Sequence, residues 1–259
     1  MFDEIKSIIP IVHPATPNRP DVFGTGTLIR IRAESFLLTA AHVWDEKSKA
    51  ELYIPVPGGF RELQGRHLCT ARRQSADRSD DLSDMCVIHL PTELANQVEK
   101  MFAFVPCDLL DSNEMPTDRT EYEFMGFPTS RSRVNTAAKH IRMIPYSFTS
   151  FPIPSRAIID MGYNPWVHVL VHFKRQKNWN ERGLRVTSPE LFGVSGGAIW
   201  RVWRREGLFG DACTKRLVGI AVANKTKAKA MIGKGRVHPL PFGIKSAQTL
   251  QSALEPYLN

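Results

Sequence analysis

Ser195 is the residue of this chain whose surroundings best suit chemistry on a hydroxyl group. It lies in the segment 191–200, LFGVSGGAIW, where a loop leads to a glycine-flanked serine and an apolar run of strand type follows. Gly193 would let a backbone N–H point toward a developing oxyanion, while Gly196 and Gly197 would admit close approach of substrate and neighbouring backbone. A serine hydroxyl is a weak nucleophile at neutral pH, so this interpretation requires a histidine and a carboxylate.

His42 is a candidate for the base. It lies in the segment 35–44, SFLLTAAHVW, which has the pattern of a buried strand running into a short turn of helix. That arrangement would deliver the imidazole just past the end of the strand. A lone histidine among apolar residues is usually structural, so it is the presence of Ser195 that makes His42 a candidate base.

Asp84 is a candidate for the acid. It ends the acidic loop 77–84, DRSDDLSD, and directly precedes the apolar run 85–91, MCVIHLP. Because it alone abuts the apolar run, we expect it to occupy a desolvated position, where a carboxylate needs a partner. The loop's other aspartates are expected to be exposed and solubilising: Asp77, Asp80 and Asp81.

The order of these residues separates two hypotheses about Ser195. Its G-x-S-x-G pattern also fits the nucleophile elbow of α/β-hydrolases, where the acid and the histidine follow the serine and a helix leaves it. Here the only histidine after Ser195 is His238, and the residues that follow the serine suit a strand. His42 and Asp84 both precede it, each at the end of an apolar strand. The order His, Asp, Ser therefore favours a catalytic triad of another architecture.

Short strands separated by turns make up most of the remaining pattern. Apolar residues at helical spacing predict a terminal helix over 244–254. The pattern therefore predicts an all-β barrel protein with one C-terminal α-helix. Besides the runs that end at His42 and begin after Asp84, the predicted strands are 8–12, 22–31, 51–55, 67–71, 121–127, 140–144, 166–173, 198–203 and 217–223.

The segment 106–120 mixes Pro, Asp, Ser and Asn without apolar periodicity, which is typical of a connector. His42 and Asp84 precede it, and Ser195 follows it. We expect three parts along the chain: an N-terminal barrel over 1–110, a connector over 111–120, and a C-terminal barrel with the terminal helix over 121–259.

The composition is that of a globular, loop-rich protein. Of 259 residues, 42% are hydrophobic and 23% charged, so the chain can bury a core without staples. No apolar stretch approaches the roughly 20 residues of a membrane span, and the N-terminus lacks a basic leader, so neither a membrane association nor a signal peptide is expected. The net charge of +8 is spread along the chain, which favours a solvated basic surface over a nucleic-acid partner.

Four cysteines are widely spaced and form no C-x-x-C pair: Cys69, Cys86, Cys107 and Cys213. This spacing argues against both a disulfide framework and a zinc site. We therefore expect reduced thiols, a cytoplasmic location and no metal.

Three sequence blocks together resemble the trypsin-like, or chymotrypsin-fold, serine peptidases. They are LTAAH at 38–42, DMCV at 84–87 and GVSGG at 193–197, in the order of that family. Weaker similarities are GTGT at 24–27, LVGIA at 217–221 and the expected terminal helix. The loops before the serine and the tail are most similar to bacterial trypsin-like domains, so a bacterial protein is expected.

The resemblance implies two antiparallel six-stranded β-barrels packed across an active-site cleft. It implies that His42 is the general base and then the general acid, that Asp84 orients the imidazole, and that the N–H groups of Gly193 and Ser195 form an oxyanion hole. The implied reaction is hydrolysis of a protein or peptide substrate through an acyl-enzyme. No metal or cofactor is implied.

Departures from the family leave the specificity pocket undefined. Trypsin carries an aspartate six positions before the serine, whereas this chain has Pro189. Glutamate-specific relatives carry a histidine near the position of Ala221. Pro189, Ala223 and Asn224 are the candidate pocket residues, and the preference for the residue before the scissile bond stays open.

Two departures concern activation and redox state. In digestive relatives a freed N-terminal ammonium pairs with an aspartate directly before the serine, but here that residue is Val194, and 8–12 lacks the glycines of the activation motif. An unpaired buried ammonium is costly, so we expect loop 186–192 to be ordered by backbone contacts or by a regulatory protein partner. Secreted relatives have a cysteine after the histidine; here it is Val43, which agrees with reduced thiols.

The alternative function is that of an inactive binding module. Such a protein would keep the two barrels and use its basic loops to hold nucleic acid or an acidic protein. A scaffold has no need of all three chemical residues, and this chain keeps His42, Asp84 and Ser195. The sequence therefore favours a serine endopeptidase.

Overall fold

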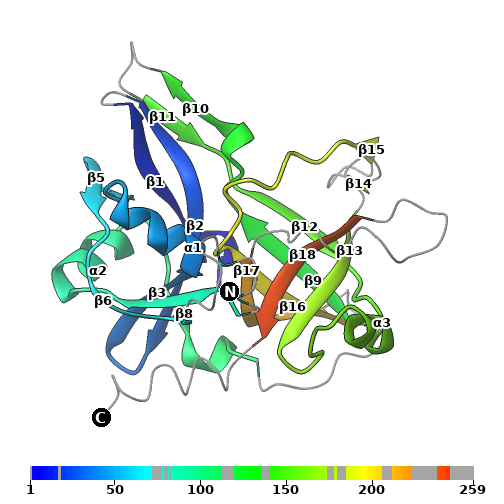
Figure 1. Ribbon diagram of the computed structural model, residues 1–259. Helices are drawn as coiled ribbons and strands as arrows, with labels where there is room; N and C mark the ends of the chain where they lie inside the picture. Colours follow the sequence, from blue (N-terminus) through cyan, green and yellow to red (C-terminus); the bar gives the residue numbers. More distant parts are fainter. Residues whose placement is uncertain are drawn as a thin grey trace.

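In the described part of the chain, two large and mainly antiparallel sheets lie beside each other, and the helices are short (Figure 1). This description is of a computed structural model, and it covers residues 2–16, 19–71, 78, 81, 83–111, 120–135, 140–173, 178–179, 185–205, 212–222 and 238–245. The predicted all-β class is confirmed.

The first sheet has the strand order β5-β4-β1-β2-β3-β7-β6, and β8 pairs with β2 in parallel. Within the described residues this sheet has eight strands where six were expected, because the stretch between α1 (Ala41–Asp45) and Asp84 contributes three short strands and β8 adds another. These strands are β1 (Ile8–Thr16), β2 (Arg19–Ile31), β3 (Glu34–Ala40), β4 (Tyr53–Val56), β5 (Gly59–Glu62), β6 (Arg66–Cys69), β7 (Met85–His89) and β8 (Val105–Pro106).

The second sheet has the order β12-β9-β16-β17-β18-β13 and closes into a barrel. Its two ends meet where Pro152 bridges Val171 and the N–H of Ile153 donates to the C=O of Leu170 at 2.8 Å. The strands are β9 (Glu121–Gly126), β12 (Tyr146–Ser150), β13 (His168–Phe173), β16 (Ala198–Arg205), β17 (Ala212–Val222) and β18 (His238–Lys245). Two separate hairpins join β10 (Ser132–Asn135) to β11 (His140–Met143) and β14 (Asn178–Trp179) to β15 (Arg185–Val186).

Apolar side chains from both halves share one core. Leu28 and Leu38 of the first sheet belong to the same buried cluster as Trp200 and Leu217 of the second. Burial of this shared apolar surface holds the two halves against each other. A smaller cluster fills the second barrel: Tyr122, Phe124, Val169, Val171, Val194, Ile199, Val218 and Ala221.

The helices differ from the sequence-based expectation. The α2 helix was not predicted, although Leu94, Ala95 and Val98 give it a buried face. In the expected terminal helix, Ile244 and Lys245 instead end β18, and 246–254 lie outside the described residues. The helices are α1 (Ala41–Asp45), α2 (Thr92–Glu99) and α3 (Ser155–Asp160), with short 3₁₀ turns η1 (Glu4–Ser7), η2 (Glu46–Ser48), η3 (Cys107–Leu109) and η4 (Thr129–Arg131). Among the helices of the described residues, none is long and apolar enough to span a membrane.

Candidate active site

Strand register brings His42 and Asp84 together. The strands β3 and β7 are antiparallel neighbours, and Ala40 pairs with Met85 at the end of the ladder. The residues just beyond this pair therefore emerge at the same edge of the sheet. His42 enters the first turn of α1 there, and Asp84 lies in the loop that leads into β7.

Asp84 holds both the imidazole of His42 and the helix that carries it. Its Oδ2 lies 2.7 Å from His42 Nδ1, its Oδ1 accepts the backbone N–H of His42 at 2.9 Å, and its C=O accepts the N–H of Ala41 at 2.9 Å. Asp84 thus supplies the N-terminal cap that Ala40, at the cap position of α1, does not provide. Its side chain is 4% exposed, against 27% for His42. A buried carboxylate and a half-buried imidazole are therefore hydrogen-bonded.

Glycines in β2 let α1 pack closely. A Cβ at Gly24 would lie 2.5 Å from Cγ1 of Val43, and a Cβ at Gly26 would lie 2.8 Å from Cδ2 of Leu37. The GTGT stretch is thus the place where β2 touches the helix of His42 and the strand before it. A larger residue at Gly24 would push against this helix, and one at Gly26 would push against Leu37 of β3.

Asp81 is not the solubilising residue that we expected. It is 4% exposed, and its carboxylate accepts hydrogen bonds from Thr70 Oγ1 at 2.7 Å, from the N–H of Ser83 at 2.9 Å and from Arg78 Nη1 at 2.9 Å. Burial acts to raise the pKa of Asp81, but these bonds and one from the N–H of Asp84 outweigh it, so the pKa lies below its usual value. The prediction failed because Arg78, three residues earlier, turns inward with it. Asp77 and Asp80 lie outside the described residues.

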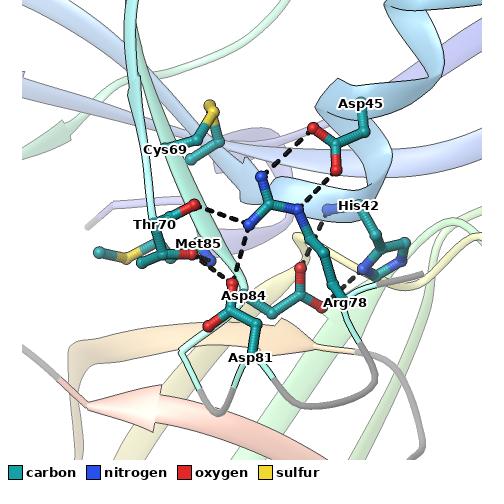
Figure 2. The surroundings of a disulfide bond; sticks show 9 residues. His42, Asp45, Cys69, Thr70, Arg78, Asp81, Asp84 and Met85 are labelled. Atoms are coloured by element: carbon teal, nitrogen blue, oxygen red, sulfur yellow. Dashed lines mark hydrogen bonds and ion pairs between the residues drawn. A yellow bond between two sulfur atoms is a disulfide. The ribbon is translucent and has the colours of Figure 1, made fainter. Parts of the chain in front are cut away.

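A disulfide joins Cys69 to Cys86 beside this cluster, which contradicts the prediction of four reduced thiols (Figure 2). The two cysteines are direct cross-strand partners in the β6–β7 ladder. The two cysteines are 17 residues apart in sequence, and their pairing depends on the register of β6 and β7, which cysteine spacing does not reveal. Cys107 and Cys213 are free and exposed. The cysteine argument for a cytoplasmic location is thereby lost.

Ser195 lies on a tight turn between the β14–β15 hairpin and β16. Gly193 and Gly196 on either side have φ of +87° and +89°, a conformation that favours glycine. A Cβ at Gly196 would lie 1.9 Å from the C=O oxygen of Thr25, and one at Gly197 would lie 2.0 Å from that of Met125. Gly196 and Gly197 therefore allow close approach of neighbouring backbone, which is the part of their predicted role that these distances test.

Threonines hold this turn. Thr25 Oγ1 donates to the C=O of Gly193 at 2.7 Å, and the N–H of Thr25 donates to the C=O of Ser195 at 2.8 Å. Thr27 Oγ1 donates to the C=O of Gly196 at 2.9 Å. Both threonines belong to β2, so the first sheet fixes the backbone of the candidate nucleophile. Nothing in the pattern of GTGT at 24–27, apart from its weak similarity to the family, indicated that its threonines bind the turn of Ser195.

Two N–H groups of the turn have no acceptor within the described part of the chain. The N–H groups of Val194, Gly196 and Gly197 donate to backbone oxygens, but those of Gly193 and Ser195 do not. These are the two donors expected to form an oxyanion hole. Nor does any hydrogen bond join Ser195 Oγ to His42 among the described residues. The side chain of Ser195 is largely covered, with the residue 9% exposed.

Apolar packing replaces an ion pair beside the serine. Val194 is 4% exposed and belongs to the core of the second barrel, and a Cβ at Gly126 would lie 2.7 Å from its Cγ1. The segment 8–12 lies in β1, where Ile8, Ile9, Ile11 and Val12 are at most 1% exposed. An N-terminal ammonium inserted beside Ser195 would therefore have no carboxylate at position 194 to pair with. The segment 8–12 is also held in β1 and is not free to supply such a terminus.

The expected specificity pocket is described only in part. Pro189 lies in the loop before the serine and is half-buried, whereas Ala223 and Asn224 lie outside the described residues. Next to Pro189, the buried Ser188 hydroxyl is hydrogen-bonded to the hydroxyl of Tyr146. Burial raises the pKa of Tyr146, so this phenol is neutral at physiological pH.

Known structures share this architecture. The chain aligns with the Grass clip serine protease of the Toll pathway in Drosophila at a TM-score of 0.57 and 12% identity, covering 99% of this chain and 71% of that one. It aligns with neuropsin, a serine protease of mouse brain, at a TM-score of 0.55 and 14% identity, covering 98% and 95%. No model of a protein family and no curated protein matches the sequence. The protein has the trypsin-like chymotrypsin fold, which confirms the fold that the sequence resemblance implied.

Proposed function

We propose that this protein is a serine endopeptidase that cleaves protein or peptide substrates through an acyl-enzyme. The observation that carries the proposal is the His42–Asp84 pair, with 2.7 Å between Nδ1 and Oδ2, in a first sheet that also binds the turn of Ser195 through Thr25. In this proposal residues 1–110 supply His42 and Asp84, and residues 121–259 supply Ser195. A fold alone does not define an activity, so the chemistry of these groups bears the argument.

The proposed mechanism follows from where each proton lies. In this mechanism the Nδ1–H of His42 donates a hydrogen bond to Asp84 Oδ2, and the unprotonated Nε2 accepts the Ser195 hydroxyl proton. Ser195 Oγ then attacks the substrate carbonyl, and the N–H groups of Gly193 and Ser195 donate to the resulting oxyanion. His42 returns its proton to the leaving amine, which breaks the peptide bond. Water repeats the sequence on the ester and releases the acid product.

The proposal implies a small movement of the Ser195 or His42 side chain when substrate binds. Catalytic hydrogen bonds are often long in the absence of substrate and tighten in the complex. Thr25 ties the backbone of Ser195 to the first sheet, and Gly196 packs against Thr39, three residues before His42. A rotation of side chains, with the backbone unchanged, is therefore the movement that this packing supports.

Active-site labelling tests the proposal. A fluorophosphonate should add one covalent group to Ser195 in the full-length, unproteolysed protein, and intact mass and peptide mapping should detect it. Ser195→Ala and His42→Ala should each abolish labelling while melting temperature stays within a few degrees, since the nucleophile and base act as a unit. A peptide library should then define the cleavage preference.

The opposite outcome would identify the inactive binding module. A folded wild-type protein that neither labels at Ser195 nor cleaves any library peptide would contradict the proposed enzyme. Labelling that appears only after removal of an N-terminal segment would contradict the expectation that backbone contacts or a protein partner, rather than a freed N-terminus, order loop 186–192.

A further inference from the structure

The loop before β7 grips α1 at both ends. Asp84 binds the N–H groups of Ala41 and His42 at the start of the helix. Arg78 binds Asp45, the last residue of the helix, through Nε at 2.5 Å and Nη2 at 3.3 Å. Figure 2 shows Arg78 reaching from the acidic loop to Asp45, with the His42–Asp84 pair beside it.

Arg78 is buried, and its guanidinium donates hydrogen bonds to three different residues. Its side chain is 5% exposed, and Nη1 also donates to the C=O of Thr70 at 2.7 Å and to Asp81 Oδ2 at 2.9 Å. Burial acts to lower the pKa of Arg78, but the hydrogen bonds and charges of Asp45 and Asp81 outweigh this effect and raise it, so the guanidinium stays charged. A planar guanidinium can reach three acceptors at once, which a lysine cannot.

Asp81 and Thr70, which both accept hydrogen bonds from Arg78, also bind the backbone on either side of Asp84. Asp81 accepts the N–H of Ser83 at 2.9 Å, and Thr70 Oγ1 accepts the N–H of Met85 at 3.1 Å. Asp84 between them has φ of +40°, and Arg78 has φ of +56°. Non-glycine residues hold such conformations only where surrounding contacts impose them.

We propose that Arg78 is a positioning residue for the His42–Asp84 pair, acting by clamping the C-terminal end of α1 onto the turn that contains Asp84. Its importance for catalysis rests on the proposed function. Its effect on the hydrogen bond between His42 Nδ1 and Asp84 Oδ2 does not depend on the proposed function, because that bond can be measured in the protein without any activity.

Loss of Arg78 has a defined consequence. Two carboxylates, Asp45 and Asp81, would lose their shared cation, so α1 and the turn would separate. The Nδ1–Oδ2 hydrogen bond would then lengthen or break. Arg78 points away from solvent, so the loss should appear in kcat with KM little changed; a displacement of about 1 Å can lower the rate about 100-fold.

Arg78→Met and Arg78→Lys test the inference with two readouts. The first is the NMR signal of the His42 Nδ1 proton, which the bond to Asp84 shifts downfield and protects from exchange, assigned by its absence in His42→Ala. The second is the rate of fluorophosphonate labelling. We expect both variants to lose the downfield signal and to label at least tenfold more slowly.

Two other arginines supply matched controls. Arg201 is similarly buried, at 2% exposure, and pairs with Asp111 at 3.2 Å in the second half. Arg30 makes a two-bond pair with Glu99 in the first half and contacts Phe104 rather than α1. Arg201→Met should lower the free energy of unfolding but keep the downfield signal of the His42 Nδ1 proton. Arg30→Met should change neither the free energy of unfolding nor this signal.

Each outcome decides a separate question. A folded Arg78→Met that retains both the signal and the labelling rate would overturn the inference. If Arg78→Met does not fold, Arg78→Lys decides, because it keeps the charge without the fork: loss of the signal supports the clamp and retention overturns it. If the wild-type protein does not label, the proposed function fails while the NMR signal still tests the clamp.

Discussion

The two halves of the molecule hold their candidate catalytic groups by different forces. In the first half, His42 and Asp84 are surrounded by charged groups, including Arg78 and Asp81, and by a disulfide. The turn of Ser195, in the second half, is held instead by neutral hydroxyls of Thr25 and Thr27 from β2 and by apolar packing within the second barrel.

The difference predicts which perturbation affects which half. Ion pairs and carboxylates respond to pH, and a disulfide responds to reductant. Neutral hydrogen bonds and close packing respond to neither, but they do not tolerate added volume. The stability of the first half should therefore depend on pH and on reductant, whereas the turn of Ser195 in the second half should be sensitive to added side-chain volume.

The largest expected effect is steric and lies in the second half. Gly196→Ala would place a Cβ 1.9 Å from the C=O oxygen of Thr25, at a φ of +89°. Backbone on both sides blocks relaxation, so we expect a loss of about 4 kcal/mol or more in the free energy of unfolding. Denaturant unfolding measures it.

Gly58→Ala is the matched control for this substitution. Gly58 has nearly the same φ, +85°, but no atom lies within 4 Å of its Cβ position. It should cost about 1–2 kcal/mol, the strain of the conformation alone. Equal losses in both variants would show that the turn of Ser195 is not sterically rigid.

The next effect is redox-dependent and belongs to the first half. The Cys69–Cys86 bond closes a loop that contains Arg78, Asp81 and Asp84. Its loss through Cys69→Ser with Cys86→Ser, or through reductant, should lower the free energy of unfolding by about 3 kcal/mol, the value typical of a loop of this length.

Cys213→Ser, at a free exposed position, should leave stability unchanged and serves as the control. Thermal unfolding with and without reductant, alongside non-reducing peptide mapping, makes the measurement. Wild-type protein that shows no disulfide and no response to reductant would remove this difference between the halves.

The smallest effect is pH-dependent. The folded-state pKa of Asp81 is lowered, so its ionised form stabilises the protein fully above the unfolded-state pKa near 4, and this contribution is lost as pH falls through the folded-state pKa. Asp81→Asn should therefore cost about 2 kcal/mol at pH 7. Below pH 4 the difference from wild type should shrink.

Asp3→Asn removes a carboxylate from an exposed pair with Lys6 and should have little effect at any pH. Urea unfolding between pH 7 and pH 3 compares the variants. A difference between Asp81→Asn and wild type that stays constant over this range would contradict the assigned ionisation of Asp81.

Local patterns in the sequence predicted much of the framework. The run before His42 forms β3 and leads into α1, and the run after Asp84 forms β7. Gly193 and Gly196, on either side of Ser195, adopt the positive φ that glycine favours. Such features depend on residues close in sequence, where alternation, branching and glycine content express backbone preference directly. They also sufficed to separate this architecture from an α/β-hydrolase.

Contacts between distant residues were decided by the tertiary structure. Arg78 meets Asp45 across 33 positions, Thr25 meets Gly193 across 168, and Cys69 faces Cys86 because β6 and β7 share one register. Shifting a strand by one residue would exchange its two faces, so strand composition alone does not reveal which side chains meet. The sequence therefore determined which groups stand at strand ends and turns. Only the folded arrangement determined which charges, hydroxyls and sulfurs hold them there, because those partners are chosen by register and packing.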